Sequence, residues 1–351
     1  MPTLPSRFIA SLVALAALSG CAAYGPSAMP KDQLAYTLSV ARSLEEQLLL
    51  NIVRTRYGEA PTFVDVSAIV AGYEYKREGS VGGEAHINNG LDSFVAPGVT
   101  IGLTEKPTVT YAPLAGEGYA RTMVAPIPPH LVLLMMQSGW SADAVLNLAV
   151  RSINGYRNRL PRLVTNAPAD PEFARISLLV RQLQDSGSVD FTVREEQDKK
   201  RAIFMTLRAS DDGTARIKVN ELRKLLGTDP ETGEIPISVG LLAPVDRGIT
   251  IYTFSLFQIL VAQGKHVVVP DGTAGLGKTE DDAPGIPSIQ VRSGRERPKS
   301  AAVAVPYGGY WFWIEGDDTG SKVTLMALTV LYRLLESGSP GNLPVLTIPA
   351  G

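Results

Sequence analysis

The sequence has 351 residues, of which 45% are hydrophobic and 19% are charged, and this balance argues against a largely disordered chain. Its 33 basic and 35 acidic residues give a formal net charge of −2, without the excess of positive charge that nucleic-acid-binding proteins carry. Cys21 is the single cysteine, so an intramolecular disulfide is excluded as well.

The first twenty residues are organised as an export signal. Arg7 lies in a short polar segment, and residues 8–18 form an apolar run of eleven residues. A membrane-spanning helix needs ~20 apolar residues, so this run fits a signal peptide that is removed on export. We therefore expect residues 1–20 to lie outside the fold.

The end of this segment, Leu18-Ser19-Gly20-Cys21, resembles a lipobox, the sequence that bacterial lipoprotein signal peptidase (signal peptidase II) cuts. The resemblance to bacterial lipoproteins implies cleavage before Cys21 and acylation of its thiol, with palmitate among the acyl groups. Ala22 stands where an aspartate retains enterobacterial lipoproteins at the inner membrane. The resemblance thus implies an outer-membrane anchor with the body in the periplasm; the inner membrane and the cell surface are the alternatives.

The residues after the cysteine predict a tether and then a long helix. Small and polar residues in 21–29 indicate a lipidated tether. From Pro30 to Gly58, apolar residues recur at intervals of three and four, which predicts one amphipathic helix. The predicted apolar stripe consists of Leu34, Leu38, Ala41, Leu44, Leu48 and Ile52.

The following segment predicts an antiparallel β meander, because β-branched and aromatic residues alternate there with polar ones. Gly82-Gly83 and Asn89-Gly90 indicate turns. Residues 30–115 are therefore expected to form a region of one helix plus the meander. The expected strands are 62–76, 84–88, 98–104 and 108–112.

Residues 116–351 predict an irregular order of helices and strands, which is typical of the α+β class. This region forms a second domain or one continuous domain with the region before it. Ser141, Asp170 and Asn220 are expected to cap helices, and the apolar last helix is expected to be buried. Helices are predicted at 130–138, 141–155, 170–185, 220–227, 254–263 and 321–336, and strands at 189–193, 203–207, 236–242, 249–252, 266–269, 286–292, 301–305 and 310–315.

Residues Gly272 to Thr279 match the spacing of a P-loop, and the apolar residues 266–269 precede them. A working P-loop needs a helix that begins at its Lys-Thr pair, because the amides of the first turn hold the phosphates. Three acidic residues follow instead, and then Pro284 and Gly285. We therefore expect no nucleotide to bind at this segment.

Two polar clusters are candidate interaction sites. Arg54, Arg56 and Tyr57 end the first helix, where arginines favour the helix dipole and can pair with acidic residues such as Glu59 or Asp65. The second cluster consists of Asp317 and Asp318, which precede the last helix. Each cluster can be interpreted structurally, as part of a helix terminus, or functionally, as a small binding site.

An aromatic strand is the third candidate. Trp311 and Trp313 alternate with Tyr310 and Phe312, so one pair is expected to face the core and the other to face a partner or a sugar. A basic cluster precedes this strand and is interpreted as a solvated loop, with lipid phosphates or a glycan as alternative contacts. The basic cluster consists of Arg292, Arg295, Arg297 and Lys299.

The sequence predicts no catalytic residue, cofactor or metal site. His86, His130 and His266 lack the spacing of metal ligands, and there is no Gly-x-Ser-x-Gly motif to indicate a nucleophilic serine.

The region from Cys21 onwards also resembles proteobacterial lipoproteins of unknown function, through stretches such as 51–66, 139–141, 152–155 and 343–347. The expected function is that of a membrane-anchored envelope lipoprotein that binds envelope proteins in an assembly, secretion or scaffolding role. The alternatives are a periplasmic hydrolase and a glycan- or lipid-binding module.

Overall fold

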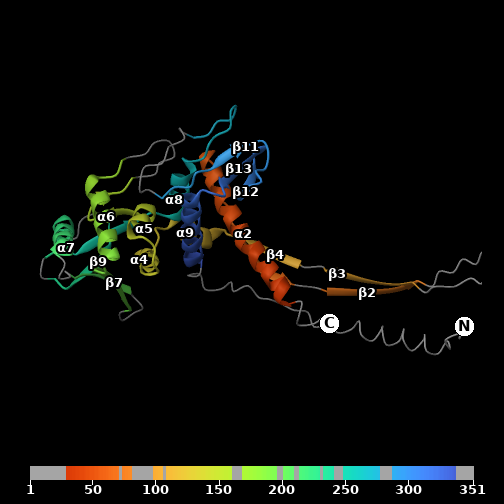
Figure 1. Ribbon diagram of the computed structural model, residues 1–351, viewed down its shortest axis with the longest axis horizontal. Helices are drawn as coiled ribbons and strands as arrows, with labels where there is room; N and C mark the ends of the chain where they lie inside the picture. Colours follow the sequence, from red (N-terminus) through yellow and green to blue (C-terminus); the bar gives the residue numbers. More distant parts are fainter. Residues whose placement is uncertain are drawn as a thin grey trace, which may run out of the picture. The chain divides into compact units, whose positions relative to one another are not determined.

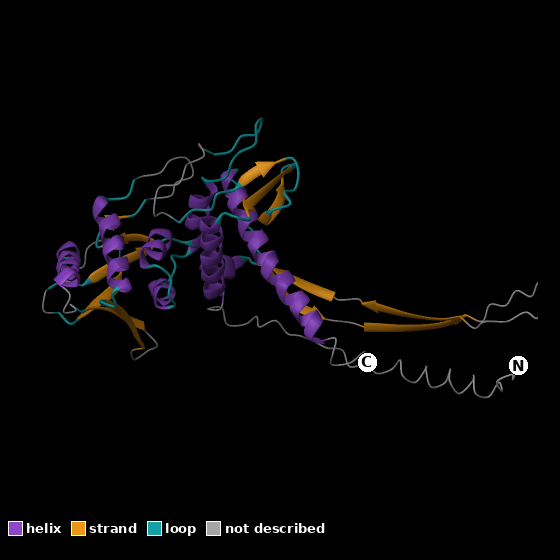
Figure 2. Cartoon of the chain, viewed as in Figure 1, coloured by secondary structure: helices purple, strands orange, loops and turns teal. Residues whose placement is uncertain are grey.

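The computed structural model has the α+β class that the sequence predicts (Figures 1 and 2). Among the residues that it describes, no helix is both long enough and apolar enough to cross a bilayer. The structure describes residues 29–70, 73–80, 98–105, 108–159, 168–195, 201–208, 213–229, 232–240, 248–276 and 287–336.

The chain forms two compact units that alternate along the sequence. We call the first the α2 unit, and it comprises residues 1–59, 161–166 and 260–330. The second, the sheet unit, comprises residues 60–160, 167–259 and 331–351. Two of the boundaries between the units fall inside helices, at residues 259/260 in α8 (Leu256–Gly264) and at residues 330/331 in α9 (Thr319–Glu336).

Helix α2 (Met29–Arg56) confirms the long helix that the apolar stripe predicts. Leu48 and Ile52 are fully buried, as the stripe requires, because the C-terminal half of α2 packs within its unit. Leu34 and Leu38, by contrast, are 60% and 61% exposed. The periodicity therefore gives the correct face of the helix, but only the second half of that face contributes to the core.

The α2 unit also contains a three-stranded antiparallel sheet in the order β11–β13–β12. The hairpin between β12 (Ala301–Tyr307) and β13 (Tyr310–Glu315) turns at Gly308 and Gly309, which both have positive φ. Glycine adopts this conformation without steric cost, so the pair suits a two-residue turn. β11 (Arg292–Gly294) forms the other edge.

Two of the predicted strands differ from the structure. The segment at 266–269 belongs to no strand, and of residues 287–292, the described part of the other segment, only Arg292 does, as the first residue of β11. The two segments meet at one bridge, between Val267 and Val291. Both residues are fully buried, so their apolar character reflects the core and not a strand. Helix α9 is present as predicted; its Leu325 and Leu328 are buried, while other positions face solvent.

The sheet unit is built on a mixed six-stranded sheet in the order β6–β5–β10–β9–β8–β7, in which β9 and β10 are parallel and the other pairs antiparallel. The predicted pairing of the two central alternating segments is confirmed, with Val189 opposite Leu207. The strands are β5 (Val150–Ile153), β6 (Tyr156–Arg157), β7 (Val189–Glu195), β8 (Arg201–Leu207), β9 (Glu234–Val239) and β10 (Ile249–Thr253).

The helices that lie wholly within this unit are α3 (Gly116–Tyr119), the π-helix η2 (Ala120–Val124), α4 (Pro129–Gln137), α5 (Ala142–Ala149), α6 (Pro171–Asp185) and α7 (Gly213–Leu226). Helices α4, α5 and α6 contact the sheet, and α7 packs on α6, which contributes the buried Phe173 and Leu179.

Two of the three helix caps expected from the sequence are confirmed in position, and the third is wrong. Ser141 and Asp170 occupy the cap positions of α5 and α6, but neither side chain bonds to the first-turn amides. The Ser141 hydroxyl bonds to the Asp143 carboxylate, and Asp170 binds the backbone amide and guanidinium of Arg157. Asn220 lies inside α7, which begins seven residues earlier, at Gly213.

The predicted meander consists of two paired segments in the sheet unit. β1 (Val64–Val70) pairs with β4 (Thr108–Pro113), and β2 (Tyr73–Ser80) pairs with β3 (Gly98–Glu105), both antiparallel. Figure 2 shows the β2–β3 pair as a two-stranded ladder. The further strand expected at 84–88 lies outside the described residues.

Candidate functional site

The C-terminal end of α2 carries a polar cluster around Glu59. The Arg54 Nε donates to one carboxylate oxygen of Glu59 at 2.9 Å, and the Tyr307 hydroxyl donates to the other at 2.7 Å. Tyr307 ends β12, so the cluster joins the end of the helix to the three-stranded sheet. The expected pairing of an arginine with Glu59 is confirmed, while Tyr307 is a partner that the sequence analysis missed.

The two hydrogen bonds shift the acidity of both partners. The bond from Tyr307, followed by that from Arg54, lowers the pKa of Glu59 because both donors favour the carboxylate. Burial, reinforced by the bond to Glu59, raises the pKa of Tyr307 to about 12. The phenol therefore stays protonated and the carboxylate stays charged throughout the physiological range, which suits a structural contact and not proton transfer.

Tyr57 adds an aromatic contact to this cluster. Its ring centroid lies 5.2 Å from that of Tyr307 and 6.2 Å from that of Phe312, the latter in an edge-to-face arrangement. Phe312 is almost fully buried in the α2 unit. Tyr57 is thus held on the sheet by its ring and contributes to packing at the helix end.

Arg56 is buried and contacts the P-loop-like segment. Its side chain is only 4% exposed, and its Nη1 donates to the Leu276 carbonyl at 2.5 Å. The Leu276 amide donates back to the Arg56 carbonyl at 2.7 Å. At Gly275 an added Cβ would lie 2.6 Å from Val269 Cγ2 and 3.0 Å from Arg56 Nε, so the segment packs closely here.

This packing gives Gly275, one glycine of the motif, a structural explanation. The Leu276 amide is committed to α2, although a P-loop would direct its amides at phosphate oxygens. Lys278 and Thr279, the residues that would contact phosphate and metal in a P-loop, lie outside the described residues.

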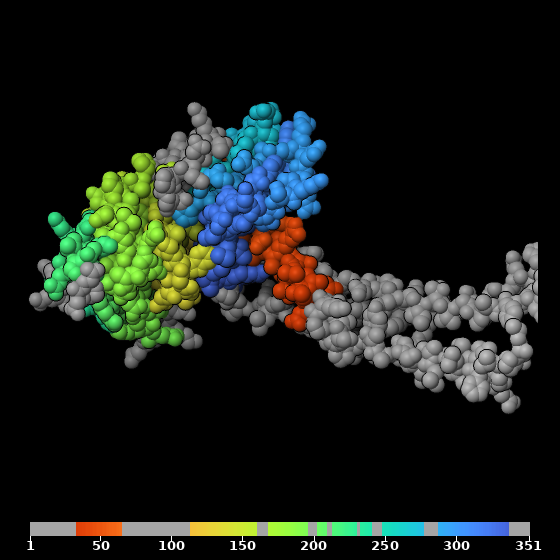
Figure 3. All heavy atoms as spheres, in the orientation of Figure 1, coloured from red at the N-terminus to blue at the C-terminus, as the bar shows by residue number. Residues whose placement is uncertain are grey.

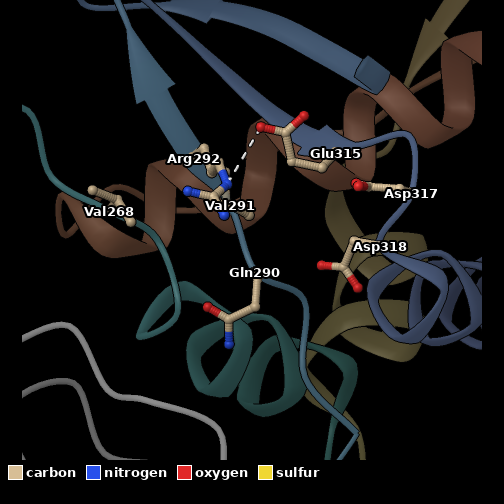
Figure 4. A pocket seen from close by; sticks show the side chains of 7 residues that line it. All are labelled: Val268, Gln290, Val291, Arg292, Glu315, Asp317 and Asp318. Atoms are coloured by element: carbon tan, nitrogen blue, oxygen red, sulfur yellow. Dashed lines mark ion pairs between the residues drawn. The ribbon is translucent and has the colours of Figure 1, made fainter. Parts of the chain in front are cut away.

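A hollow of about 280 Å³ brings Asp317 and Asp318 together with Glu315 and Arg292 (Figure 4). Figure 4 shows Asp317 and Asp318 on one side of the view and the Arg292–Glu315 ion pair beside them, with an N–O distance of 3.3 Å. The remaining lining residues are Val268, Gln290 and Val291.

Two of these three carboxylates have structural partners. Asp318 accepts a bond from the Ser321 amide at 3.0 Å and one from the Ser321 hydroxyl at 2.5 Å, so the predicted cap of the last helix is confirmed. The same hydroxyl accepts a hydrogen bond from the backbone amide of Gln290 at 2.8 Å. Asp317 alone among them has no such bond within the described residues, and a single exposed carboxylate makes no acid–base pair.

The aromatic strand β13 alternates from Trp311 onwards, while Tyr310, which was expected to share the face of Phe312, is partly exposed. Phe312 is buried, whereas Trp311 and Trp313 are partly exposed. The guanidinium of Arg297 lies 5.2 Å from the Trp311 ring and that of Arg295 lies 5.6 Å from the Tyr310 ring. Neither tryptophan lines one of the two hollows found in the α2 unit.

The candidate residues thus fall into separate places of the α2 unit. Arg54, Arg56 and Tyr57 lie at the end of α2, and the aspartates lie at the start of α9; Cys21 lies outside the described residues. The described residues include no group of three or more histidine, cysteine or acidic side chains placed to hold a metal ion. Comparisons with protein families, with curated proteins and with solved structures each found no match to this chain.

Proposed function

We propose that this chain is an outer-membrane lipoprotein, anchored through Cys21, whose periplasmic body binds envelope proteins in an assembly, secretion or scaffolding role. The observation that carries the proposal is the two-stranded ladder of β2 and β3. The lipobox resemblance at 18–21 supports the anchor, because two or more acyl chains hold a protein stably at a bilayer.

The β2–β3 ladder supports a binding role through its backbone. Eight consecutive residue pairs connect the strands, from Tyr73 opposite Glu105 to Ser80 opposite Gly98. Among the described residues no third strand pairs with either one, so within this part of the chain both outer edges are open to a further strand. An isolated two-stranded ladder is marginally stable in water, and an open edge accepts a strand from another protein.

The alternatives have less support. A periplasmic hydrolase would draw its acid and base from the acidic hollow, where Glu315 is held by Arg292 and Asp318 by Ser321. A glycan-binding module would line a hollow with Trp311 or Trp313, and neither side chain lines the acidic hollow or the other hollow described in the α2 unit.

Shortening the ladder tests the proposal directly. Val70 is paired with Thr108, so an Asn-Gly turn can replace residues 71–107 and close a hairpin from β1 and β4 alone. We expect this variant to keep its circular dichroism and thermal midpoint but to lose the proteins that crosslink to the intact chain in living cells. The measurement is envelope crosslinking followed by affinity purification and mass spectrometry.

A matched control shortens the hairpin of β7 and β8, where Glu195 is paired with Arg201, by placing Asn-Gly between these two residues. This control is expected to keep all partners. Recovery of no partner with the intact chain would refute the binding role, and recovery of the same partners with the shortened β2–β3 variant would refute the role of the ladder.

A further inference from the structure

A second hollow in the α2 unit, of about 320 Å³, has a different character from the acidic one. Arg42 of α2 lines one side, and Arg297 and Lys299 line the other from the loop that joins β11 to β12. Figure 3 shows the surfaces of α2, in red, and of this part of the chain, in blue, side by side. The remaining lining residues are Pro298, Ala301 and Ala304.

The hollow concentrates positive charge in a chain whose formal net charge is −2. Its lining includes three cationic side chains, and none of the described lining residues is acidic. Glu46 forms an ion pair with Arg42 at 3.1 Å. The three cationic side chains and this one carboxylate together carry a formal charge of +2. That pair is exposed and contributes little, so an incoming anion can compete with Glu46 for the guanidinium.

One of the three cationic groups is held by a packing contact. The Arg297 guanidinium lies 5.2 Å from the centroid of the Trp311 ring, a cation–π contact that restricts the side chain. Pro298 limits the backbone freedom of the loop between the two basic residues. Ala301 and Ala304 have short side chains, so the space between α2 and β12 stays open.

We propose that this hollow binds a phosphate group, and that its ligand is the headgroup of an anionic phospholipid. Arginine forks match the geometry of phosphate oxygens, and two arginines with one lysine can neutralise its charge. The volume lies at the lower end of the ~300–1,000 Å³ range of small-ligand sites, which fits a headgroup and excludes a large glycan. The proposal does not depend on the protein-binding role or on the β2–β3 ladder.

The test uses the full chain with Cys21→Ser, so that no acyl chain contributes to membrane binding. Binding is measured by co-sedimentation with phosphatidylglycerol vesicles and with phosphatidylcholine vesicles, and by calorimetry with inorganic phosphate. We expect a preference for phosphatidylglycerol that weakens about tenfold in Arg42→Ala and in Arg297→Ala, as for the loss of a charge-assisted hydrogen bond. Lys299→Ala, at an exposed position, repeats the test with little risk to folding.

Arg295→Ala is the matched control, because Arg295 belongs to the same loop but lies over Tyr310 and does not line the hollow. It removes the same charge and is expected to bind vesicles as the parent chain does. An equal loss in Arg295→Ala, or no preference for phosphatidylglycerol, would overturn the proposal. A third outcome separates the two parts of the proposal. If calorimetry shows that phosphate binds and that Arg42→Ala weakens this binding about tenfold, but vesicle binding shows no preference for phosphatidylglycerol, the phosphate site stands and the phospholipid headgroup is excluded as its ligand.

Discussion

Glu59 is the residue at which the end of α2 depends most on long-range contacts. It accepts one hydrogen bond from Arg54, five residues earlier, and one from Tyr307, which lies 248 positions further along the chain. The first partner was predictable because it is local in sequence. The second was not, because nothing in the sequence around Tyr307 indicates that β12 ends beside this helix terminus.

Replacing Glu59 with glutamine is expected to lower the pKa of Tyr307 from about 12 while leaving it above its ordinary value of 10.0. Burial is the larger cause of the raised pKa and remains in Glu59→Gln, whereas the bond to a charged carboxylate is lost. Ultraviolet difference titration after a rapid pH jump measures the change, and the Tyr307→Phe variant identifies the signal. An unchanged pKa would show that burial alone sets it.

The sign of the pH dependence follows from the same two shifts. Because the pKa of Glu59 is lower in the folded state than its unfolded value of 4.5, its ionised carboxylate stabilises the fold above pH 4.5. This stabilisation is lost as the pH falls through the folded-state pKa. Because the pKa of Tyr307 is raised from 10.0 to about 12 on folding, its protonated phenol stabilises the fold below pH 10.0. This stabilisation is lost as the pH rises through about 12. Because Glu59 is about half exposed, solvent screening keeps its contribution below ~1 kcal/mol.

At the scale of elements, the packing of residues 270–276 on α2 predicts the effect of a single methyl group. Gly275→Ala would place its Cβ 2.6 Å from Val269 Cγ2 and 3.0 Å from the buried Arg56 Nε. We expect a loss of ~1–3 kcal/mol in the free energy of unfolding, as for other overpacked sites. Urea unfolding measures it.

Gly213→Ala provides the control for that measurement. Gly213 begins α7, has open space around its Cα and needs no positive φ, so an alanine there is expected to be neutral or slightly stabilising. Equal stability of Gly275→Ala and the parent chain would mean that the segment is not held against Arg56. The spacing of the P-loop-like glycines would then need another explanation.

Elements that form through interactions between residues close in the sequence were predicted, and elements that depend on distant residues were not. Helix α2 and the β7–β8 pair were predicted because their apolar periodicity is local. The helix expected at 141–155 instead ends at Ala149, because residues 150–153 pair with β10, about one hundred positions away. Apolar residues around Val267 and Val291 were mistaken for strands because a buried loop and a buried strand have the same composition.

At the scale of the whole molecule, the α+β class was predictable and the division into units was not. The irregular order of helical and strand patterns is a property of the linear sequence. The α2 unit, however, combines residues 1–59 with residues 260–330, and no change of composition indicates that these ranges share a core. The basic hollow was missed for the same reason, because Arg42 and Arg297 come from these two distant ranges.

The proposed anchor of the molecule is one thiol, so Cys21→Ser is expected to release the protein from the membrane. No helix among the described residues can span a bilayer, and the segment at 8–18 is too short to do so if it is uncleaved. Cell fractionation should therefore move the variant from the outer membrane to the soluble periplasmic fraction. Intact-mass measurement of the parent chain should show the loss of residues 1–20 and the addition of acyl groups. A Cys21→Ala variant controls for the serine hydroxyl, and membrane retention of both variants would show that another part of the chain holds the protein at the envelope.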